Sequence, residues 1–421
     1  MRVALVSEHA SPLAVLGGAD AGGQNVHVAA LATALAARGH RVEVLTRRDD
    51  PAVAEVVPLA DGVDVVHVPA GPPQVLPKDD LLPFMGEMGA WMARRWSDGP
   101  RPDVVHAHFW MSALATRAAG RRLPVRVPTA VTFHALGVVK RRHQGAQDTS
   151  PPARLRLERS VVRTVDAVVA TCRDEVRELL ALGAEPRRLH VVPCGVDLDR
   201  FTPEGRRDAP WRPGATRLLC LGRVVERKGV ETAIEALVHL PDAELVVAGG
   251  PDAGRLAEDP DVRRLAACAE RLGVADRVRL VGRTDPDGAA ALLRAADVVV
   301  AVPWYEPFGI VPLEAMACGT PVVASAVGGM LDTVQPGVTG AHVPPRDPLA
   351  VATAVRALAG DRGALARAGR AGADRVRGTY GWSRVAAGTE AVYEHLTPSS
   401  RRRLEPVPSE RTTTTGAEEA P

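Results

Sequence analysis

Short apolar runs alternate with stretches of helical periodicity along most of the chain. Arg2–Val6 is apolar, residues 8–22 are rich in Gly, Ser and Ala, residues 23–38 have helical periodicity, and Arg41–Leu45 is apolar again. A strand, a loop, a helix and a strand in this order open a parallel α/β domain. The first half continues with predicted strands at Val104–His106, Val127–Thr132, Ala167–Ala170 and His190–Val192, and with a helix at Arg173–Leu182.

A segment rich in Gly, Pro and charge, residues 196–216, separates this series from a second one of the same kind. The pattern predicts an α/β protein of two facing Rossmann-like domains, residues 1–195 and 217–378, with a cleft between them. The tail at 398–421 is of low complexity, and we expect it to be disordered. In the second half we predict strands at 217–221, 244–248, 278–281, 298–302 and 321–325, and helices at 230–239, 261–272, 287–295 and 312–317.

Length and composition restrict the class of protein. A chain of 421 residues suits two domains, and its net charge of +2 gives no reason to expect a nucleic-acid partner. No apolar run approaches the roughly 18–20 residues that span a bilayer, and the N-terminus has the pattern of a strand, not of a signal peptide. The five cysteines are scattered without a CxxC pair, which favours a reducing compartment, and we expect a cytoplasmic protein.

The scarcity of lysine marks three positions. Lysine and arginine together number 52, and only Lys78, Lys140 and Lys228 are lysines. A position that remains Lys in so Arg-rich a chain is a candidate for a compact ammonium group. Lys228 and Arg223 lie in the loop GRVVERKG after the strand at 217–221, where two cations between glycines suit a diphosphate. A plain surface loop is the alternative.

The loop before the first helix contains GADAGGQN, which does not fit GxGxxG, and the chain has no GxxxxGK[ST]. NAD and P-loop sites are therefore disfavoured. Gly22 and Gly23 nevertheless allow backbone N–H groups to approach an anion at a helix N-terminus, although they could be only a flexible helix start.

Histidines end two strands of the first half, in HAHFW and TFHALG. Alternation places His106 and His108 on one face, which raises the possibility of a metal site. No cluster of carboxylates or cysteines accompanies them, so we predict no metal. We interpret His134 as a polar wall residue near the substrate, and a core role remains open for His106.

The stretch EPFGIVPLEAMACGTP carries two glutamates, Glu306 and Glu314, eight positions apart. With Pro312 at N1, Glu314 would lie at N3 and stabilise the helix N-terminus. The free N–H groups near the start of this helix could bind phosphate or sugar hydroxyls, and ionised carboxylates suit vicinal diols. Glu306 could also be only a solvated loop charge.

Five segments carry a family resemblance: GGQNVHVAALATALAARGHRV, ATCRDEVRELLALG, VVPCGVDLDRF, LGRVVERKG and EPFGIVPLEAMACGTPVVASAVGG. Together they resemble the family 4 retaining glycosyltransferases, whose fold is the two-domain GT-B type, over about residues 1–395. The most specific motif is E-x7-E, here Glu306 to Glu314. Within the family, the chain is most similar to the inositol-phosphate glycosyltransferases of mycothiol synthesis and to bacterial sucrose-phosphate synthases.

The resemblance implies a role for each matching residue. Glu314 would hold the ribose of a sugar nucleotide, Glu306 would contact the donor sugar, and Arg223 and Lys228 would neutralise the diphosphate without a metal. His134 would lie over the donor sugar. The other residues implied in donor binding are Gly22, Gly23, Arg283, Thr284, Phe308, Gly309, Ile310 and Val311. Residues 379–397 would form a helix that crosses back to the first domain.

The acceptor is less well defined. Lys78, in VLPKDDL, resembles the segment that contacts the acceptor phosphate in the mycothiol enzymes. Their HYW and HT are replaced here by His108-Phe109-Trp110 and His134-Ala135, which removes two hydroxyl donors. Inositol phosphate is therefore not the default acceptor, although a phosphorylated one remains possible. The residues predicted to face the acceptor are Asn25, Lys78, Phe109, Lys140 and Arg154.

The sequence thus predicts a metal-independent, cofactor-free glycosyltransferase that moves a hexosyl group with retention from a nucleotide-diphosphate sugar, UDP-linked in preference, to a hydroxyl acceptor. One alternative is a mannosyltransferase that uses GDP-mannose and acts on a lipid or glycan, with basic segments at 117–126 and 140–143 touching an anionic membrane. Another is a catalytically silent sugar-nucleotide-binding protein. The acceptor could be a small molecule, a lipid or a glycan.

Overall fold

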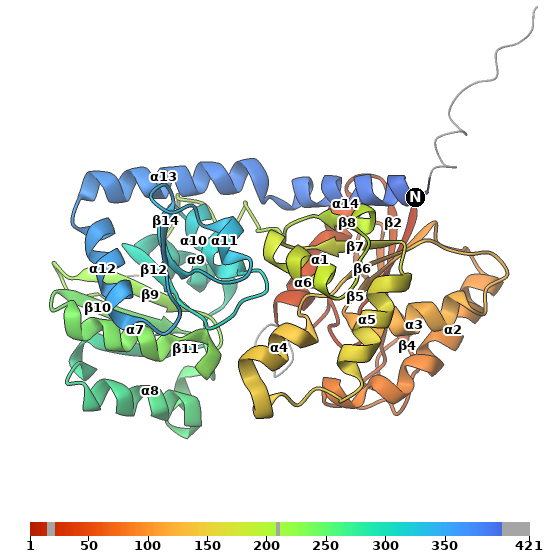
Figure 1. Cartoon of the computed structure of the whole chain (residues 1–421), viewed down its shortest axis with the longest axis horizontal. Helices are drawn as coiled ribbons and strands as arrows, with labels where there is room; N and C mark the ends of the chain where they lie inside the picture. Colours follow the sequence, from red (N-terminus) through yellow and green to blue (C-terminus); the bar gives the residue numbers. More distant parts are fainter. Residues whose placement is uncertain (15–21, 208–210, 398–421) are drawn as a thin grey trace, which may run out of the picture.

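The computed structural model describes residues 1–14, 22–207 and 211–397. It contains two α/β units side by side, each built on its own sheet (Figure 1). The tail that the sequence predicts to be disordered, 398–421, lies outside the described residues. Among the helices that are described, none is both long enough and apolar enough to cross a bilayer.

The first sheet has the strand order β3-β4-β2-β1-β5-β6-β7-β8. Adjacent strands in this sheet are parallel, except that β3 runs antiparallel to β4. This β3–β4 hairpin was not predicted, because the side chains of β3 are only partly buried and Pro58 interrupts its apolar alternation. The strands are β1 (Arg2–Val6), β2 (Arg41–Arg47), β3 (Val56–Ala60), β4 (Val63–Val68), β5 (Val104–His108), β6 (Thr129–Thr132), β7 (Ala167–Ala170) and β8 (Leu189–Val191).

The second sheet is parallel throughout, in the order β11-β10-β9-β12-β13-β14. Its order reverses between β9 and β12, and in open α/β sheets ligands bind beyond the strand C-termini at such a point. The strands are β9 (Thr216–Leu221), β10 (Ala243–Ala248), β11 (Val278–Gly282), β12 (Val298–Ala301), β13 (Val322–Ser325) and β14 (Gly340–Val343).

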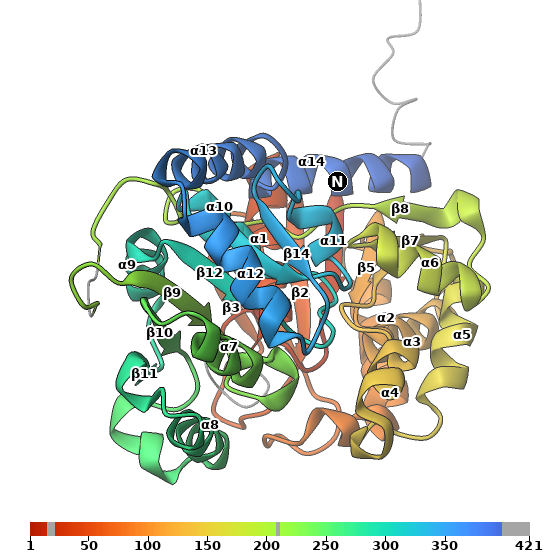
Figure 2. The ribbon, with the colours of Figure 1, turned by 60° about the vertical axis from the view of Figure 1, so that its left-hand side comes forward.

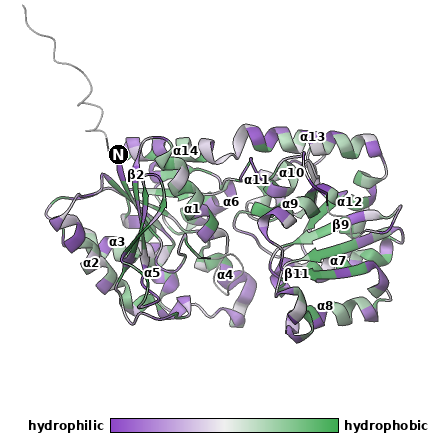
Figure 3. Ribbon diagram, turned by 180° about the vertical axis from the view of Figure 1, so that it is seen from behind, coloured by the Kyte–Doolittle hydropathy of each residue, from purple (hydrophilic) through white to green (hydrophobic). Residues whose placement is uncertain are grey.

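Helices cover both faces of each sheet. The central strands are hydrophobic along their length because both of their faces are buried, whereas hydrophilic residues gather on the helices (Figure 3). Every strand and helix predicted from the sequence is present, with ends displaced by three residues or fewer. The helices are α1 (Gly23–Ala36), α2 (Met85–Asp98), α3 (Trp110–Gly120), α4 (Gly137–Gln144), α5 (Arg154–Thr164), α6 (Arg173–Ala181), α7 (Val230–Ala236), α8 (Pro260–Arg271), α9 (Pro286–Ala295), α10 (Ile310–Ala317), α11 (Met330–Thr333), α12 (Pro348–Ala359), α13 (Arg362–Thr379) and α14 (Trp382–Leu396).

The last two helices run along one side of both units (Figures 1 and 2). α13 packs on α10 of the second unit, and α14 packs on α1 of the first. Glu390 of α14 pairs with Arg38 and lies 3.0 Å from His40 Nε2. The hydroxyl of Tyr393 lies 2.7 Å from His106 Nδ1, inside the first unit. The C-terminal helix therefore returns to the N-terminal unit.

Candidate functional site

The loop between β12 and α10 forms one corner of the site. Gly309 has a φ of +86°, which suits glycine, and this turn lets α10 begin at Ile310. The predicted helix start was therefore wrong: Pro312 lies at N3, not N1, and Glu314 lies at N5, not N3. A proline is tolerated at N3 because the N–H it lacks would have no partner in the helix. The N–H groups of Ile310 and Val311 also have no partner within α10.

Glu306 lies at the centre of a cluster of cations. Lys228 Nζ donates a hydrogen bond to its carboxylate, and an Arg227 nitrogen lies 3.8 Å from the same oxygen. Burial alone would raise the pKa of Glu306, but the charges of Lys228, Arg227 and Arg223 and the hydrogen bond from Lys228 outweigh burial and lower it. Glu306 is therefore ionised, and its oxygens can only accept hydrogen bonds.

Glu314 has the opposite environment. Burial raises the pKa of its carboxyl group to about 7. Within residues 1–14, 22–207 and 211–397, no side chain forms a hydrogen bond or ion pair with this carboxyl group. Two glutamates eight positions apart thus have distinct states, one ionised and paired, the other near the midpoint of its titration at neutral pH.

Two glycines fix the backbone around these residues. A Cβ on Gly229, next to Lys228, would lie 2.0 Å from the carbonyl oxygen of Val302, and one on Gly328 would lie 1.9 Å from that of Glu306. Both glycines have positive φ, +71° and +51°. The turn that carries Lys228 is therefore pressed against the end of β12.

Gly229→Ala tests this packing. The new methyl group meets backbone, which cannot rotate away, so the turn must move and displace Lys228. We expect a lower melting temperature and at least a ten-fold loss of whatever activity depends on Lys228. Gly273→Ala is the matched control. Gly273 has a similar φ of +67°, but apart from its two chain neighbours no described residue has an atom within 4 Å of the new methyl position. The cost of Gly273→Ala should be only about 1 kcal/mol. Equal behaviour of the two variants would contradict the proposed contact.

The first unit approaches this corner through α1. Gly22 is the N-cap of α1, and a Cβ on Gly23 would lie 3.2 Å from Ile310 Cδ1 of α10. The structure therefore brings together the two helix N-termini predicted to bind anions. Asn25 has a different position: its amide is buried, accepts from Gly22 N at 3.0 Å and donates to Ser11 O at 2.9 Å. Its side chain therefore ties the N-cap of α1 to Ser11, and its contact with an acceptor stays a prediction.

The histidines of β5 and β6 form a buried group. His106 is a satisfied core histidine, because its two ring nitrogens lie 2.7 Å from Tyr393 and 2.9 Å from Thr132. His134, with a φ of +60°, is partly exposed, and its Nε2 lies 2.9 Å from His108 Nδ1. Burial, with a smaller effect from neighbouring histidines, lowers the pKa of both well below the ordinary value. Both rings are neutral at physiological pH.

Two of the three cations predicted to face an acceptor are engaged with acids. Arg154 is buried, its Nε lies 2.7 Å from Glu158, and it donates to the carbonyl of Ala135 at 2.7 Å. Its guanidinium carbon lies 5.1 Å from the centre of the Phe109 ring. Lys140 lies 3.0 Å from Asp148. Two of the predicted phosphate ligands thus have their charge balanced inside the protein.

Most of the remaining predicted residues lie on loops that follow strands of the second sheet. Arg223 follows β9 and contributes to the field on Glu306. Arg283 and Thr284 follow β11, and Arg283 lies 3.2 Å from Asp252. Phe308 is buried just before α10. Lys78 begins a short 3-10 turn, Lys78–Asp80.

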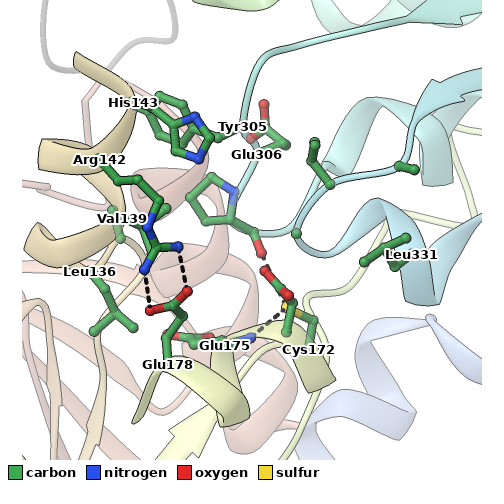
Figure 4. A pocket seen from close by; sticks show the side chains of 16 residues that line it. Leu136, Val139, Arg142, His143, Cys172, Glu175, Glu178, Tyr305, Glu306 and Leu331 are labelled. Carbon is green, nitrogen blue, oxygen red and sulfur yellow. Dashed lines mark hydrogen bonds and ion pairs between the residues drawn. The ribbon is translucent and has the colours of Figure 1, made fainter. Parts of the chain in front are cut away.

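A cavity of about 230 Å³ lies between the two units, with Glu306 in its wall (Figure 4). Contacts across it join α4 and α6 to the loops of the second sheet. Gln144 donates to the Tyr305 hydroxyl at 2.7 Å, the His143 ring stacks on Tyr305, and Cys172 Sγ lies 3.4 Å from the carbonyl of Pro307. The site is therefore built from both units.

Sequence reasoning missed several residues of this region. Arg227 was a visible neighbour of Lys228 in the ERKG turn. His9 stacks edge-on against Phe109 with ring centres 4.9 Å apart, and only its place in the loop after β1 could have indicated it. Tyr305 and Gln144 meet across 161 positions of sequence, and no local signal connects them.

Comparison with known proteins identifies the family. The family described as Glycosyltransferase Family 4 matches residues 21–200, and that described as Glycosyl transferases group 1 matches residues 202–375. The D-inositol 3-phosphate glycosyltransferase 1 of Catenulispora acidiphila is 40% identical over 96% of this chain and 97% of its own. The chain belongs to glycosyltransferase family 4. A second D-inositol 3-phosphate glycosyltransferase, from Xylanimonas cellulosilytica, is 41% identical to this glycosyltransferase over 94% of the chain and 97% of the relative.

A solved structure agrees in fold. The sucrose-phosphate synthase of Thermosynechococcus elongatus superposes with a TM-score of 0.83 and 31% identity, covering 94% of this glycosyltransferase and 99% of that chain. The GT-B fold predicted from the sequence is therefore confirmed. The enzyme is a glycosyltransferase that uses a nucleotide sugar.

Proposed function

We propose that this enzyme transfers a hexosyl group from a UDP-sugar to a hydroxyl acceptor, with retention of the anomeric configuration and without a metal. The observation that carries the proposal is the cluster of Lys228, Arg227 and Glu306 beside the N-terminus of α10, with Glu314 one turn further along. Cations and free N–H groups are what a departing diphosphate requires, and they act without reorganisation when they are held in place.

Each residue has a distinct role in this scheme. Lys228 and Arg223 neutralise the diphosphate as the glycosidic C–O bond breaks, with the N–H groups of Ile310 and Val311 nearby. The ionised Glu306 accepts hydrogen bonds from the donor sugar, and Glu314 accepts from the ribose diol. The acceptor hydroxyl attacks from the face that the diphosphate leaves, and its proton passes to the departing phosphate oxygen. No enzymic nucleophile is needed, and Glu306 is unsuited to that role while cations surround it.

The preference for UDP rests on the resemblance of the motifs to the inositol-phosphate and sucrose-phosphate members of the family. GDP-mannose is the alternative donor. His134 forms part of the sugar-facing wall in this proposal, and Gly22 and Gly23 allow the first unit to approach the diphosphate.

For the acceptor, the relatives' names make D-inositol 3-phosphate the first compound to test. A second candidate is an uncharged polyol or glycan, because Arg154 and Lys140 already have acidic partners. A phosphorylated acceptor would have to share or displace these pairs.

A turnover screen tests the proposal. Purified enzyme would be offered UDP-, GDP- and ADP-sugars with each acceptor, and release of the nucleotide and the glycosylated product would both be measured. We expect turnover with a UDP-sugar, unchanged by an excess of EDTA, because protein cations supply the positive charge. Turnover only with a GDP-sugar, or loss of activity on chelation that Mg²⁺ or Mn²⁺ restores, would contradict the proposed donor or the proposed chemistry.

A further inference from the structure

Three histidines from separate segments converge in the first unit. His27 lies on α1, His108 ends β5 and His134 follows β6. One ring nitrogen of each lies within 4.8 Å of a ring nitrogen of each of the others. The ring centres are 5.6 Å apart for His27 and His108, 5.0 Å for His27 and His134, and 5.2 Å for His108 and His134. The sequence showed only two strand-end histidine motifs, and His27 was not part of the prediction.

These separations fit a shared ligand. Three imidazoles bound to one tetrahedral Zn²⁺ at about 2.0–2.1 Å would place their ring centres roughly 5 Å apart. The ligand nitrogens themselves would be about 3.3 Å apart, so at most about 1.5 Å of approach is required. Side-chain rotation supplies a shift of this size.

Within the described part of the chain, two ring nitrogens of this group are unpaired, and a third lone pair becomes available when metal binding replaces the 2.9 Å hydrogen bond between His108 Nδ1 and His134 Nε2. His27 Nδ1 and His108 Nε2 are buried and have no partner among the described residues. The neighbouring His106 differs, because both of its nitrogens are satisfied by Tyr393 and Thr132. Buried polar atoms are normally paired, so two unpaired imidazole nitrogens in one group require an explanation.

We propose that His27, His108 and His134 form a binding site for one Zn²⁺-class cation, and that its occupancy inhibits sugar transfer. Imidazole is a common ligand for Zn²⁺, Co²⁺ and Ni²⁺, whereas Mg²⁺ and Ca²⁺ require oxygen ligands. His134 is partly exposed, which leaves a path for the ion and a fourth position for water. Binding itself does not depend on the proposed function. Inhibition does, because it requires His134 to form the sugar-facing wall.

The binding test uses the whole chain and the metal alone. Co²⁺ would be titrated into the protein, followed by its visible absorption, and Zn²⁺ would then be added as a competitor. We expect one equivalent of Co²⁺, displaced by Zn²⁺, and no corresponding signal with Mg²⁺. Zn²⁺ should also raise the melting temperature, because it binds only the folded state.

His27→Gln is the decisive variant, because His27 has no part in the proposed transfer. We expect it to lower the affinity for Co²⁺ and Zn²⁺ at least ten-fold and to abolish the thermal shift, while its melting temperature without metal stays close to that of the wild type. His108→Gln should lose the metal in the same way, which keeps the test decisive if one variant folds poorly. His190→Gln removes a histidine outside the cluster and should bind as the wild type does.

Absence of stoichiometric binding, or equal binding by the wild type and both cluster variants, would overturn the site. Inhibition by Zn²⁺ should be half complete at the concentration that half fills the site, and His27→Gln should resist it. Zn²⁺ bound at this cluster with undiminished transfer would overturn the proposed inhibition and count against the position of His134 in the sugar pocket. A wild-type enzyme that binds Zn²⁺ but turns over no UDP-sugar would instead count against the proposed function.

Discussion

Lys228→Ala should reduce kcat by about 10²–10³-fold and leave the fold intact. Removing a preorganised group that stabilises charge developing in the transition state typically has an effect of this size. Lys228 pairs with Glu306 across 78 positions of sequence, and Arg227 lies 3.8 Å from the same carboxylate oxygen. Glu306 therefore keeps a cation, and the melting temperature should change by only a few degrees.

Steady-state kinetics at saturating donor would measure this loss. Lys228→Arg should recover part of the activity, since the charge remains but the compact ammonium does not. Arg38→Ala is the control: it removes a cation that pairs with Glu390 of α14, has no role in the proposed transfer, and should leave kcat unchanged. Wild-type kcat in Lys228→Ala at saturating donor would exclude the diphosphate role.

Glu314→Gln should weaken binding of UDP about ten-fold or more and make the protein more stable at pH 8. The pKa of Glu314 is raised to about 7 in the folded state, above the ordinary value of about 4.3. The folded state therefore binds a proton more tightly than the unfolded state, and this group's contribution to stability falls as pH rises from about 4 to about 7. The Gln side chain cannot ionise, so this loss of stability disappears. Its amide group is a poorer hydrogen-bond acceptor for a ribose diol than a carboxylate.

The stability effect should be about 1–3 kcal/mol at pH 8 and near zero at pH 4, measured by chemical unfolding at both pH values. Glu306→Gln is the control of opposite sign. The pKa of Glu306 is lowered in the folded state, so its ionised form contributes stability that is present at neutral pH and lost in acid. A Glu314→Gln variant equally stable at every pH, with unchanged affinity for UDP, would contradict the environment proposed for Glu314.

Much of the fold followed from periodicity because both sheets are buried on their two faces. The strand patterns at 298–302 and 321–325 predicted β12 and β13 to within a residue. The start of α10 did not follow, because the left-handed conformation of Gly309 is a property of the folded loop and Pro312 offered a simpler start.

The chemistry of the site was predictable where motif residues lie close in sequence, as in GRVVERKG and E-x7-E. The partners of side chains were not. Arg154 was predicted to meet an acceptor, but the fold buries it against Glu158, one helical turn away. His27 joined His108 and His134 only through the packing of α1 against the ends of β5 and β6. Such contacts depend on the arrangement of elements, which periodicity alone does not determine.

The central claim is that one corner, from Glu306 to Glu314, holds both ends of a sugar nucleotide. Calorimetric titration of UDP and of the UDP-sugar selected by the turnover screen, into the wild type and the two Gln variants, tests it directly. Glu314→Gln should lower the affinity for both UDP and the UDP-sugar. Glu306→Gln should lower the affinity for the UDP-sugar only. It should bind UDP as tightly as the wild type or more tightly, because Lys228 no longer pairs with a carboxylate at position 306. Equal losses for both ligands in both variants, or weaker UDP binding in Glu306→Gln alone, would contradict the account.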